Sequence, residues 1–478
     1  MAGLSFDSLE PIFHPRSIAL AGITVANPEH WTRTFFDSLI AFKFNGPLYL
    51  VNRRGGEIGG RKVYQSLEDI PSSVDYVIST VPAKAAAGLV EECAGKGVKA
   101  IHFCTAGFGE TGEEEGARLE AELVEVSQRK GIRILGPNCM GIYCPESRLS
   151  FMDDFPRDSG TVGYISQSGG NATNLVMQTM WRGVRFSKVI SYGNACDLNE
   201  SDFLEYLIAD SNTEVIALYI EGVKDGKRFR QVLEKAARDK VVVLLKGGVT
   251  TGGARAAAGH TGVLAGSEAT WDALCKQLGV IRVGTMEELA DTLVTLLFMP
   301  IPKGGRVALI GIGGGASVLI TDEFERRGLE VPPLPQEMSG RIRQFTSAAG
   351  NILRNPIDYS QTMVEVDKLI RTVNIVSRWD GIDAVVGFIS PGRASLNLRS
   401  KMVEMVEGMA EGSRAGSKPM AIVIEPSIVT EETREILPII QRSVSSRLPV
   451  FHSFAGAANA ISLLLNRNKR SRLNQPGR

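Results

Sequence analysis

Short runs of aliphatic and β-branched residues alternate with helical segments along almost the whole sequence. In the first third, the apolar runs are "SIALAGI", "GPLYLVN", "DYVISTV", "AIHFCTAG" and "IRILGPN". Segments with helical periodicity lie between them, for example at 83–97 and 114–131. Strands that are apolar on both faces and separated by helices are typical of parallel sheets covered on both sides. The alternation therefore predicts an α/β fold built from doubly wound sheets.

The alternation divides into three series. The second runs from "TVGYISQSG" to "VIRVG", and the third from "RVALIGIGGG" to "LPVFHSFAG". The segment "MPIPKGGR" at 299–306 separates the last two and, with its prolines and glycine pair, is typical of a linker. A chain of 478 residues is also too long for a single core. We therefore predict three doubly wound domains, at 1–150, 151–298 and 299–478.

Composition excludes several classes of protein. Lys and Arg together number 53, as do Asp and Glu, so the net charge of zero gives no general attraction to nucleic acid or to an anionic membrane. The longest apolar run, "LVTLLFMPI", is too short to span a bilayer, and the N-terminus lacks the pattern of a secretory signal. The six cysteines are scattered, which favours free thiols in a reducing compartment. We expect a soluble, cytoplasmic protein.

The first small-residue loop follows the strand "SIALAGI". It has one glycine, Gly22, where a dinucleotide-binding motif would have three. The second strand of this domain ends with Asn52, Arg53 and Arg54 instead of the acid that binds a ribose hydroxyl. Basic residues there favour a phosphorylated nucleotide, and both NADP and coenzyme A (CoA) remain candidates.

Each of the other two domains has a similar loop between a strand and a helix. "SQSGGNATN" at 166–174 combines hydroxyls, amides and two glycines at a helix start, which suits a phosphate; the alternative is a well-capped helix. "GIGGGASV" at 311–318 has four glycines at the same topological position. It either holds a carboxylate or phosphate, or packs tightly against a neighbour.

Glu221 and His260 form the candidate catalytic pair. Glu221 ends an apolar strand at the carboxyl edge, where ligands bind in open α/β sheets. His260, one of only five histidines, follows the next strand and lies in the small-residue segment "AAAGHTGVLAGS". A carboxylate that accepts a hydrogen bond from one imidazole nitrogen leaves the other nitrogen nucleophilic. The flanks supply no further metal ligands, and no G-x-S-x-G motif is present, but a purely structural histidine remains an alternative.

Five motifs together resemble a known family. They are "GPNCMGIY", "VGYISQSGG", "SYGNACDLNESDFLEYL", "LYIEGVKDGKRF" and "GHTGVLAGSEATWDALCKQLGVIRV". In this order they resemble the nucleoside-diphosphate-forming acyl-CoA synthetases, relatives of succinyl-CoA synthetase, and most closely the α subunit of ADP-forming acetate–CoA ligase. The resemblance covers almost the whole chain, through "NPIDYSQ". It implies a Rossmann-like CoA-binding domain followed by two flavodoxin-like domains, the last a ligase-CoA domain.

The resemblance also implies residue roles. His260 resembles a histidine that is transiently phosphorylated on a swinging loop, and Glu221 resembles the acid that orients it. The implied phosphate-binding residues are Ser166, Gln167, Ser168, Gly169 and Gly170. The implied CoA contacts are Gly22, Thr24, Asn52 and Arg53 near the nucleotide, with Pro82 and Asn138 near the pantetheine. Gly313, Gly314 and Gly315 would border the acyl site.

The implied reaction joins a small carboxylic acid to CoA through an acyl phosphate and a phosphohistidine. An ATP-grasp domain is not found in this sequence, so a separate β subunit, carrying ATP or ADP and Mg²⁺, is expected to supply the nucleotide step, in an α2β2 hetero-oligomer. Two loops depart from the family pattern: "GITVANPEHW" contains the bulky Trp31, and "GIGGGASV" replaces "TNAGG". A non-catalytic CoA-binding protein and an NADP-dependent oxidoreductase remain alternatives. The acid, the nucleotide base and the direction of flux stay open.

Overall fold

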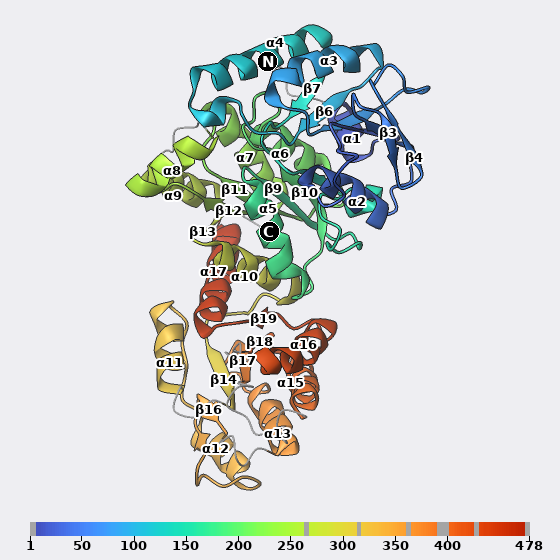
Figure 1. Cartoon of the computed structure of the whole chain (residues 1–478). Helices are drawn as coiled ribbons and strands as arrows, with labels where there is room; N and C mark the ends of the chain where they lie inside the picture. The colour runs from blue at the N-terminus through green and yellow to red at the C-terminus, as the bar shows by residue number, and fades with distance from the viewer. Residues whose placement is uncertain are drawn as a thin grey trace. The chain divides into compact units, whose positions relative to one another are not determined.

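Contacts within the chain separate it into two units. In this computed structural model, the described residues are 6–261, 267–312, 317–359, 365–389, 401–424 and 430–473. The first unit comprises Met1–Met180 and Arg185–Met286; the second comprises Trp181–Val184 and Glu287–Arg478. The first unit contains two sheets and the second contains one (Figure 1).

The N-terminal sheet has seven strands in the order β3-β4-β2-β1-β5-β6-β7, and only the β3–β4 pairing is antiparallel. Its strands are β1 (Ile18–Ala21), β2 (Leu48–Val51), β3 (Gly56–Ile58), β4 (Arg61–Tyr64), β5 (Tyr76–Ser79), β6 (Ala100–Phe103) and β7 (Arg133–Leu135). Its helices are α1 (Phe6–Phe13), α2 (Thr34–Ala41), α3 (Ala86–Gly95) and α4 (Glu114–Lys130), and α3 lies beside α4 (Figure 1). Val77 of β5 packs in the cluster that contains Leu89 and Leu123 of these two helices.

The second sheet has the order β13-β12-β11-β9-β10-β8, and β8 alone is antiparallel to its neighbour. Its strands are β8 (Gly141–Tyr143), β9 (Val162–Ser166), β10 (Phe186–Ser191), β11 (Val215–Ile220), β12 (Val241–Lys246) and β13 (Ile281–Val283). The accompanying helices are α5 (Gly169–Met180), α6 (Glu200–Ala209), α7 (Gly226–Asp239), α8 (Thr251–Thr261) and α9 (Glu268–Leu278). Nearly every residue of β9 to β12 is buried, as expected for strands covered on both faces.

The second unit is built on the sheet β15-β16-β14-β17-β18-β19, in which only β15 is antiparallel. Its strands are β14 (Val307–Ile312), β15 (Ile352–Leu353), β16 (Ile357–Asp358), β17 (Ala384–Ile389), β18 (Met420–Ile424) and β19 (Val450–Phe451). Its helices are α10 (Met286–Phe298), α11 (Ser317–Arg326), α12 (Gln336–Arg343), α13 (Val366–Val376), α15 (Met402–Gly416), α16 (Thr430–Ser445) and α17 (Phe454–Leu473). Alternate residues of β14 face opposite cores: Leu309 packs with α11 and α17, and Ile310 packs with α12, α13, α15 and α16. This is the two-faced burial of a doubly wound sheet.

The predicted fold class is confirmed. Every apolar run that the sequence analysis assigns to a strand series contains an observed strand, whereas the longest apolar run, "LVTLLFMPI", lies mostly in α10. The strands that the sequence reading missed are β3, β4, β8, β15 and β16, which are short and lie at or next to sheet edges. All six cysteines have free thiols. Within the described ranges, none of the helices combines the length and apolar character needed to cross a bilayer.

Candidate active site at the edge of the second sheet

Three neighbouring strands of the second sheet, β12, β11 and β9, end at the same carboxyl edge. β9 leads into α5, which begins at Gly169, and β11 leads to Glu221. β12 ends at Lys246 and leads into α8, which carries His260. The parallel register therefore brings the start of α5, the carboxylate-bearing strand end and the segment entering α8 to one edge.

Glu221 is held by contacts on its backbone and its side chain, and it is only 4% exposed. Its backbone N–H donates to Oε1 of Gln167 over 2.8 Å, and the N–H of Gly222 donates to the same oxygen over 3.1 Å. The hydroxyl of Tyr219 donates to Glu221 Oε1 over 3.1 Å. Burial and the neighbouring Glu221 carboxylate raise the pKa of Tyr219 above its usual range, so this phenol stays a hydrogen-bond donor. The carboxylate is therefore fixed in position.

Lys246 is a buried ammonium beside Glu221, and the sequence reading did not select it. Its Nζ donates to the backbone carbonyl of Glu221 over 2.6 Å and to that of Gly247, and it lies 5.5 Å from the centre of the Trp271 ring. Burial lowers the pKa of Lys246, whereas the Glu221 charge acts in the opposite direction. A lysine that ends the apolar run "VVVLL" at the same edge as Glu221 was the available sequence signal.

The start of α5 exposes unpaired backbone donors. Ser168 caps the helix, because its Oγ accepts from the N–H of Asn171 over 3.3 Å. The described residues provide no acceptor for the N–H groups of Gly169 and Gly170, and Gly170 is exposed. These groups suit an anion. Among the predicted phosphate-binding residues, Ser166 and Gln167 are buried, with Ser166 Oγ donating to the Ser168 carbonyl over 2.7 Å.

His260 lies in the last turn of α8, where the sequence reading expected a loop. Thr250 begins this helix: its Oγ1 accepts from the N–H of Gly253 and its carbonyl from that of Ala254. Four alanines follow, and alanine has the highest helix propensity, which explains the helix. The side chain of His260 and all of residues 262–266 lie outside the described residues.

A second candidate site is a cleft of about 340 Å³ in the N-terminal sheet. It lies at the carboxyl ends of β1, β2 and β5 and is lined by Gly22, Asn52, Arg53, Arg54, Pro82 and seven further residues, among them Gln65 and Glu92. Gly22 has a φ of +92°, and an added Cβ would lie 2.8 Å from the Thr80 carbonyl carbon, so only glycine fits. Arg53 and Arg54 are both exposed, so the part of the cleft that they line is positively charged and suits a phosphate.

Two predicted CoA contacts do not line this cleft. The backbone N–H of Thr24 donates to Thr32 Oγ1 over 3.2 Å. Asn138 lies near Asn194, with 3.5 Å between its Nδ2 and Asn194 Oδ1, and Asn194 in turn donates to Glu110 and Glu120. Asn52 does line the cleft, but its side chain is partly committed, since Nδ2 donates to the carbonyl of Ile23 over 2.8 Å. Gly313, Gly314 and Gly315, which follow β14, lie outside the described residues.

Comparison with known proteins identifies the chain. The family model of a CoA-binding domain matches residues 16–145, and that of a succinyl-CoA ligase-like flavodoxin domain matches residues 159–296. The α subunit of ADP-forming acetate–CoA ligase II from Pyrococcus furiosus is 36% identical over 430 residues, which cover 90% of this chain and 92% of the relative. The chain belongs to the ADP-forming acyl-CoA synthetase family. It is thus an acid–thiol ligase chain of the α-subunit type, as the motifs indicated.

Further relatives support this assignment to the ADP-forming acyl-CoA synthetase family. The α subunit of ADP-forming acetate–CoA ligase I from P. furiosus is 41% identical, covering 73% of this chain and 76% of that one. Acetyl-coenzyme A synthetase 1 of Candidatus Korarchaeum cryptofilum, solved with phosphate and ADP, has a TM-score of 0.80 and 29% identity, covering 98% of this chain and 99% of that one. ADP-forming acetate–CoA ligase I of Archaeoglobus fulgidus is 37% identical, and this chain spans 55% of its length. The match of residues 16–145 to a CoA-binding domain favours CoA over NADP as the ligand of the N-terminal domain.

Proposed function

We propose that this chain is the α subunit of an ADP-forming ligase for a small carboxylic acid, with His260 as the carrier of the phosphoryl group. Glu221 accepts a hydrogen bond from one imidazole nitrogen and stabilises the cation formed when the other is phosphorylated. The N–H groups at the start of α5, at Gly169 and Gly170, hold the phosphoryl group during transfer.

The order of the strands is the observation that carries this proposal. In the sheet, β11 lies between β12 and β9. β12 leads into the helix that carries His260, β11 ends directly before Glu221, and β9 leads into α5. Lys246 adds positive charge at this edge, although its three-donor head is directed to backbone carbonyls. Positive groups and helix N-termini stabilise the charge that develops on a transferred phosphoryl group.

The proposed reaction has three steps. The γ-phosphoryl group of ATP passes to the free imidazole nitrogen of His260, and ADP leaves. A carboxylate oxygen of the acid then attacks the phosphorus of phosphohistidine, which gives an acyl phosphate and restores the imidazole. Finally, the CoA thiolate attacks the acyl carbon, a thioester forms, and inorganic phosphate leaves. The reaction is reversible, so the same groups serve ATP synthesis from acyl-CoA.

In our proposal, the domains 1–150, 151–298 and 299–478 bind CoA, the phosphoryl group and the acid, respectively. The basic cleft in the first takes the nucleotide end of CoA, with Arg53 and Arg54 near its 3′-phosphate. The second takes the phosphoryl group, and Gly313–Gly315 in the third border the acid. ATP or ADP with Mg²⁺ binds an ATP-grasp β subunit in an α2β2 assembly; the relatives named α subunits support such a partner. Acetate, the acid in their names, is the first acid to test.

Phosphate labelling tests the proposal. The chain is incubated with γ-³²P-ATP and a β subunit co-purified from the native source, and we expect label that is stable in base and lost in acid. His260→Ala abolishes both label and turnover, and Glu221→Gln lowers both. His14→Gln is the matched control, because His14 directly follows α1 in the N-terminal domain and lies 3.7 Å from Glu10. This variant should retain both label and turnover.

Full turnover by His260→Ala would overturn the proposal. So would tight CoA binding without label or ligase activity in the presence of the β subunit, which is the behaviour of a non-catalytic CoA-binding protein. A chain that ligates acids other than acetate would keep the mechanism and change only the substrate.

A further inference from the structure

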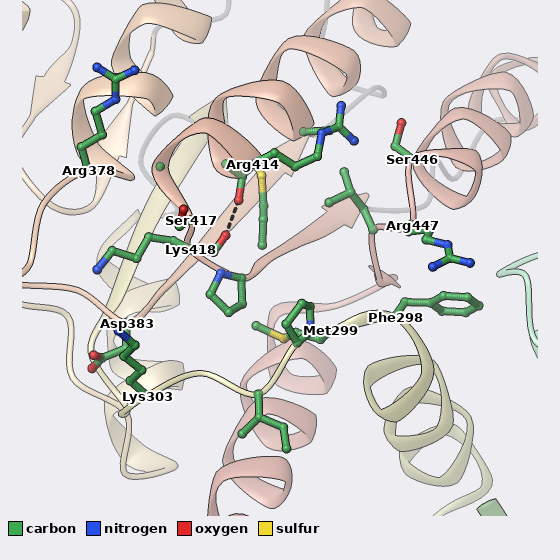
Figure 2. Close-up of a pocket in the computed structure, with 18 of the residues that line it drawn as sticks. Phe298, Met299, Lys303, Arg378, Asp383, Arg414, Ser417, Lys418, Ser446 and Arg447 are labelled. Atoms are coloured by element: carbon green, nitrogen blue, oxygen red, sulfur yellow. Dashed lines mark hydrogen bonds between the residues drawn. The ribbon is translucent and has the colours of Figure 1, made fainter. Parts of the chain in front are cut away.

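The second unit has a large hollow that the proposed reaction does not use. Its volume is about 890 Å³, and its walls come from the end of α10 and the segment after it, and from the turns that follow α13, α15 and α16. The residues just before β17, β18 and β19, including Asp383, Pro419 and Leu448, line it (Figure 2). It therefore lies at the amino edge of the sheet. The opposite, carboxyl edge is the one at which β14 ends, at Ile312.

The floor of the hollow is apolar. The end of α10 and the segment after it contribute residues 297–301. The segments that enter β18 and β19 contribute Pro419, Met420 and Leu448. Met299 and Met420 are buried, whereas Ile301 is 47% exposed. An exposed isoleucine beside methionines and prolines offers an apolar molecule a surface that water solvates poorly.

The rim carries more positive than negative charge. Lys418 is engaged, since its Nζ donates to the Ile382 carbonyl over 2.9 Å and lies 4.0 Å from Asp380. Asp383 is neutralised by a two-pronged ion pair with Arg306, and those hydrogen bonds lower the pKa of its carboxyl. Four further cations of the rim have no side-chain hydrogen bond or ion pair to the described residues: Lys303, Arg378, Arg414 and Arg447.

The dipoles of three helices offset only part of the positive charge on the rim. Arg378, Arg414 and Arg447 lie at or just beyond the carboxyl ends of α13, α15 and α16, where a cation is favourable. Each helix end supplies only about half a negative charge, so a positive surplus remains. Figure 2 shows Arg414 and Arg447 on one side of the hollow and Lys303 and Lys418 on the other, so a molecule on the apolar floor has cations on two sides.

We propose that this hollow is a second ligand site, which takes an anionic amphiphile: a molecule with an apolar body and a carboxylate or phosphate group. The volume falls within the range of about 300–1,000 Å³ found for small-molecule sites. The body would displace water from Phe298, Pro300 and Ile301, and the guanidinium forks of Arg414 and Arg447 would bind the anion. The proposal rests on the second unit alone and does not depend on phosphorylation of His260.

A pair of matched probes tests the proposal on the full chain. The anionic probe is 8-anilinonaphthalene-1-sulfonate, and the neutral probe, N-phenyl-1-naphthylamine, has the same ring system without the sulfonate. We expect the double variant R414S/R447S to weaken binding of the anionic probe about tenfold and to leave the neutral probe almost unchanged, because charge-assisted hydrogen bonds are lost. I301S should weaken both probes. The control R341S/R343S removes two exposed arginines of α12, away from the hollow, and should change neither.

Competition identifies the anion. Displacement of the sulfonate probe by octanoate would assign a carboxylate ligand, and displacement by octyl phosphate would assign a phosphate ester. Displacement by neither overturns the proposal. Equal probe affinities in R414S/R447S, I301S and the unmodified chain would also overturn it, since the bound probe would then lie elsewhere. All these positions are exposed, so circular dichroism melts should coincide and exclude misfolding.

Discussion

The side-chain oxygen of Gln167 accepts a hydrogen bond from the backbone N–H of Glu221 over 2.8 Å. The two residues follow adjacent parallel strands, β9 and β11. Because the same oxygen also accepts from Gly222, Gln167 fixes the turn that presents the Glu221 carboxylate. A residue expected to contact phosphate directly thus has half of its amide engaged with the backbone. Its NH₂ group takes no part in this contact.

Replacing Gln167 by methionine tests this contact. The substitution keeps the length of the side chain and leaves two N–H groups without their acceptor, which should lower the free energy of unfolding by about 2–4 kcal/mol. Ser168→Ala, which removes only the cap of α5, should cost about 1 kcal/mol. Urea denaturation of both variants gives the comparison. A cost for Gln167→Met no larger than that of Ser168→Ala would show that the contact is unimportant.

Lys246→Met tests the buried ammonium at the same edge. The hydrocarbon stem is retained, and the carbonyls of Glu221 and Gly247 lose their donor. Because two carbonyls are left without a donor, the free energy of unfolding should fall by about 1–3 kcal/mol. We expect labelling of His260 to fall about tenfold or more under conditions where the variant is still folded, because small displacements of a catalytic group are costly. Normal labelling in a folded variant would show that Lys246 is not needed for phosphorylation of His260. Lys246→Arg should retain part of the labelling.

The sequence predicts the central strands well and the edges of the sheets poorly. β11 and β12 are continuous apolar runs that leave little alternative to a buried strand. β3 and β4, with the sequences "GEI" and "RKVY", are short, polar and partly exposed, so their pairing depends on neighbours that a local pattern does not reveal.

The candidate site was predictable in position but not in detail. Glu221 is a lone acid at the end of an apolar strand, and topology alone places it at the carboxyl edge. The partner of the Gln167 amide was not predictable, because an uncharged amide satisfies a phosphate or a backbone N–H equally well. His260 was expected in a loop because its segment resembles the swinging loop of the family, but the alanines of α8 favour the helix.

Arg53 and Arg54 allow a test of the CoA cleft with two ligands. We expect the double variant R53S/R54S to raise the Kd for CoA about tenfold, because charge-assisted contacts to the 3′-phosphate are lost. The Kd for dephospho-CoA, which lacks that phosphate, should change much less. R61S on β4 is the control, since Arg61 is exposed and does not line the cleft. Isothermal titration calorimetry of the unmodified chain and the two variants with each ligand measures the six Kd values. An equal loss of affinity for both ligands would place the arginines near another part of CoA.

Glu200 should make stability depend on pH. It is buried at the start of α6, and burial, with a further contribution from the charge of Asp202, raises the pKa of its carboxyl from 4.5 to about 7. As pH rises from 4.5 to 7, the unfolded state loses this proton first, so folding loses stability. The full cost above pH 7 is roughly 3 kcal/mol. Glu200→Gln should therefore gain up to that amount over the unmodified chain at pH 8, and almost nothing at pH 4.5.

Denaturant unfolding at several pH values measures the effect of Glu200. Glu125→Gln is the control, because Glu125 is exposed on α4 of the same unit and should show no pH-dependent difference. A gain for Glu200→Gln that is equally large at pH 4.5 would mean that packing, not ionisation, is responsible.

Arg182 and Asp291 form a buried ion pair within the second unit. Arg182 Nη2 donates to Asp291 Oδ1 over 2.6 Å, its Nε donates to the carbonyl of Val450 over 2.8 Å, and both side chains are less than 5% exposed. Removing one partner leaves a buried charge uncompensated, so Asp291→Asn should lower stability by about 3–5 kcal/mol. The double variant R182M/D291N removes both charges and should recover most of the loss. Hydrogen exchange of β14 and β17 should accelerate in the single variant, while β9 and β11 of the first unit serve as the internal control. Equal stability of the single and double variants would show that the buried charge carries no penalty.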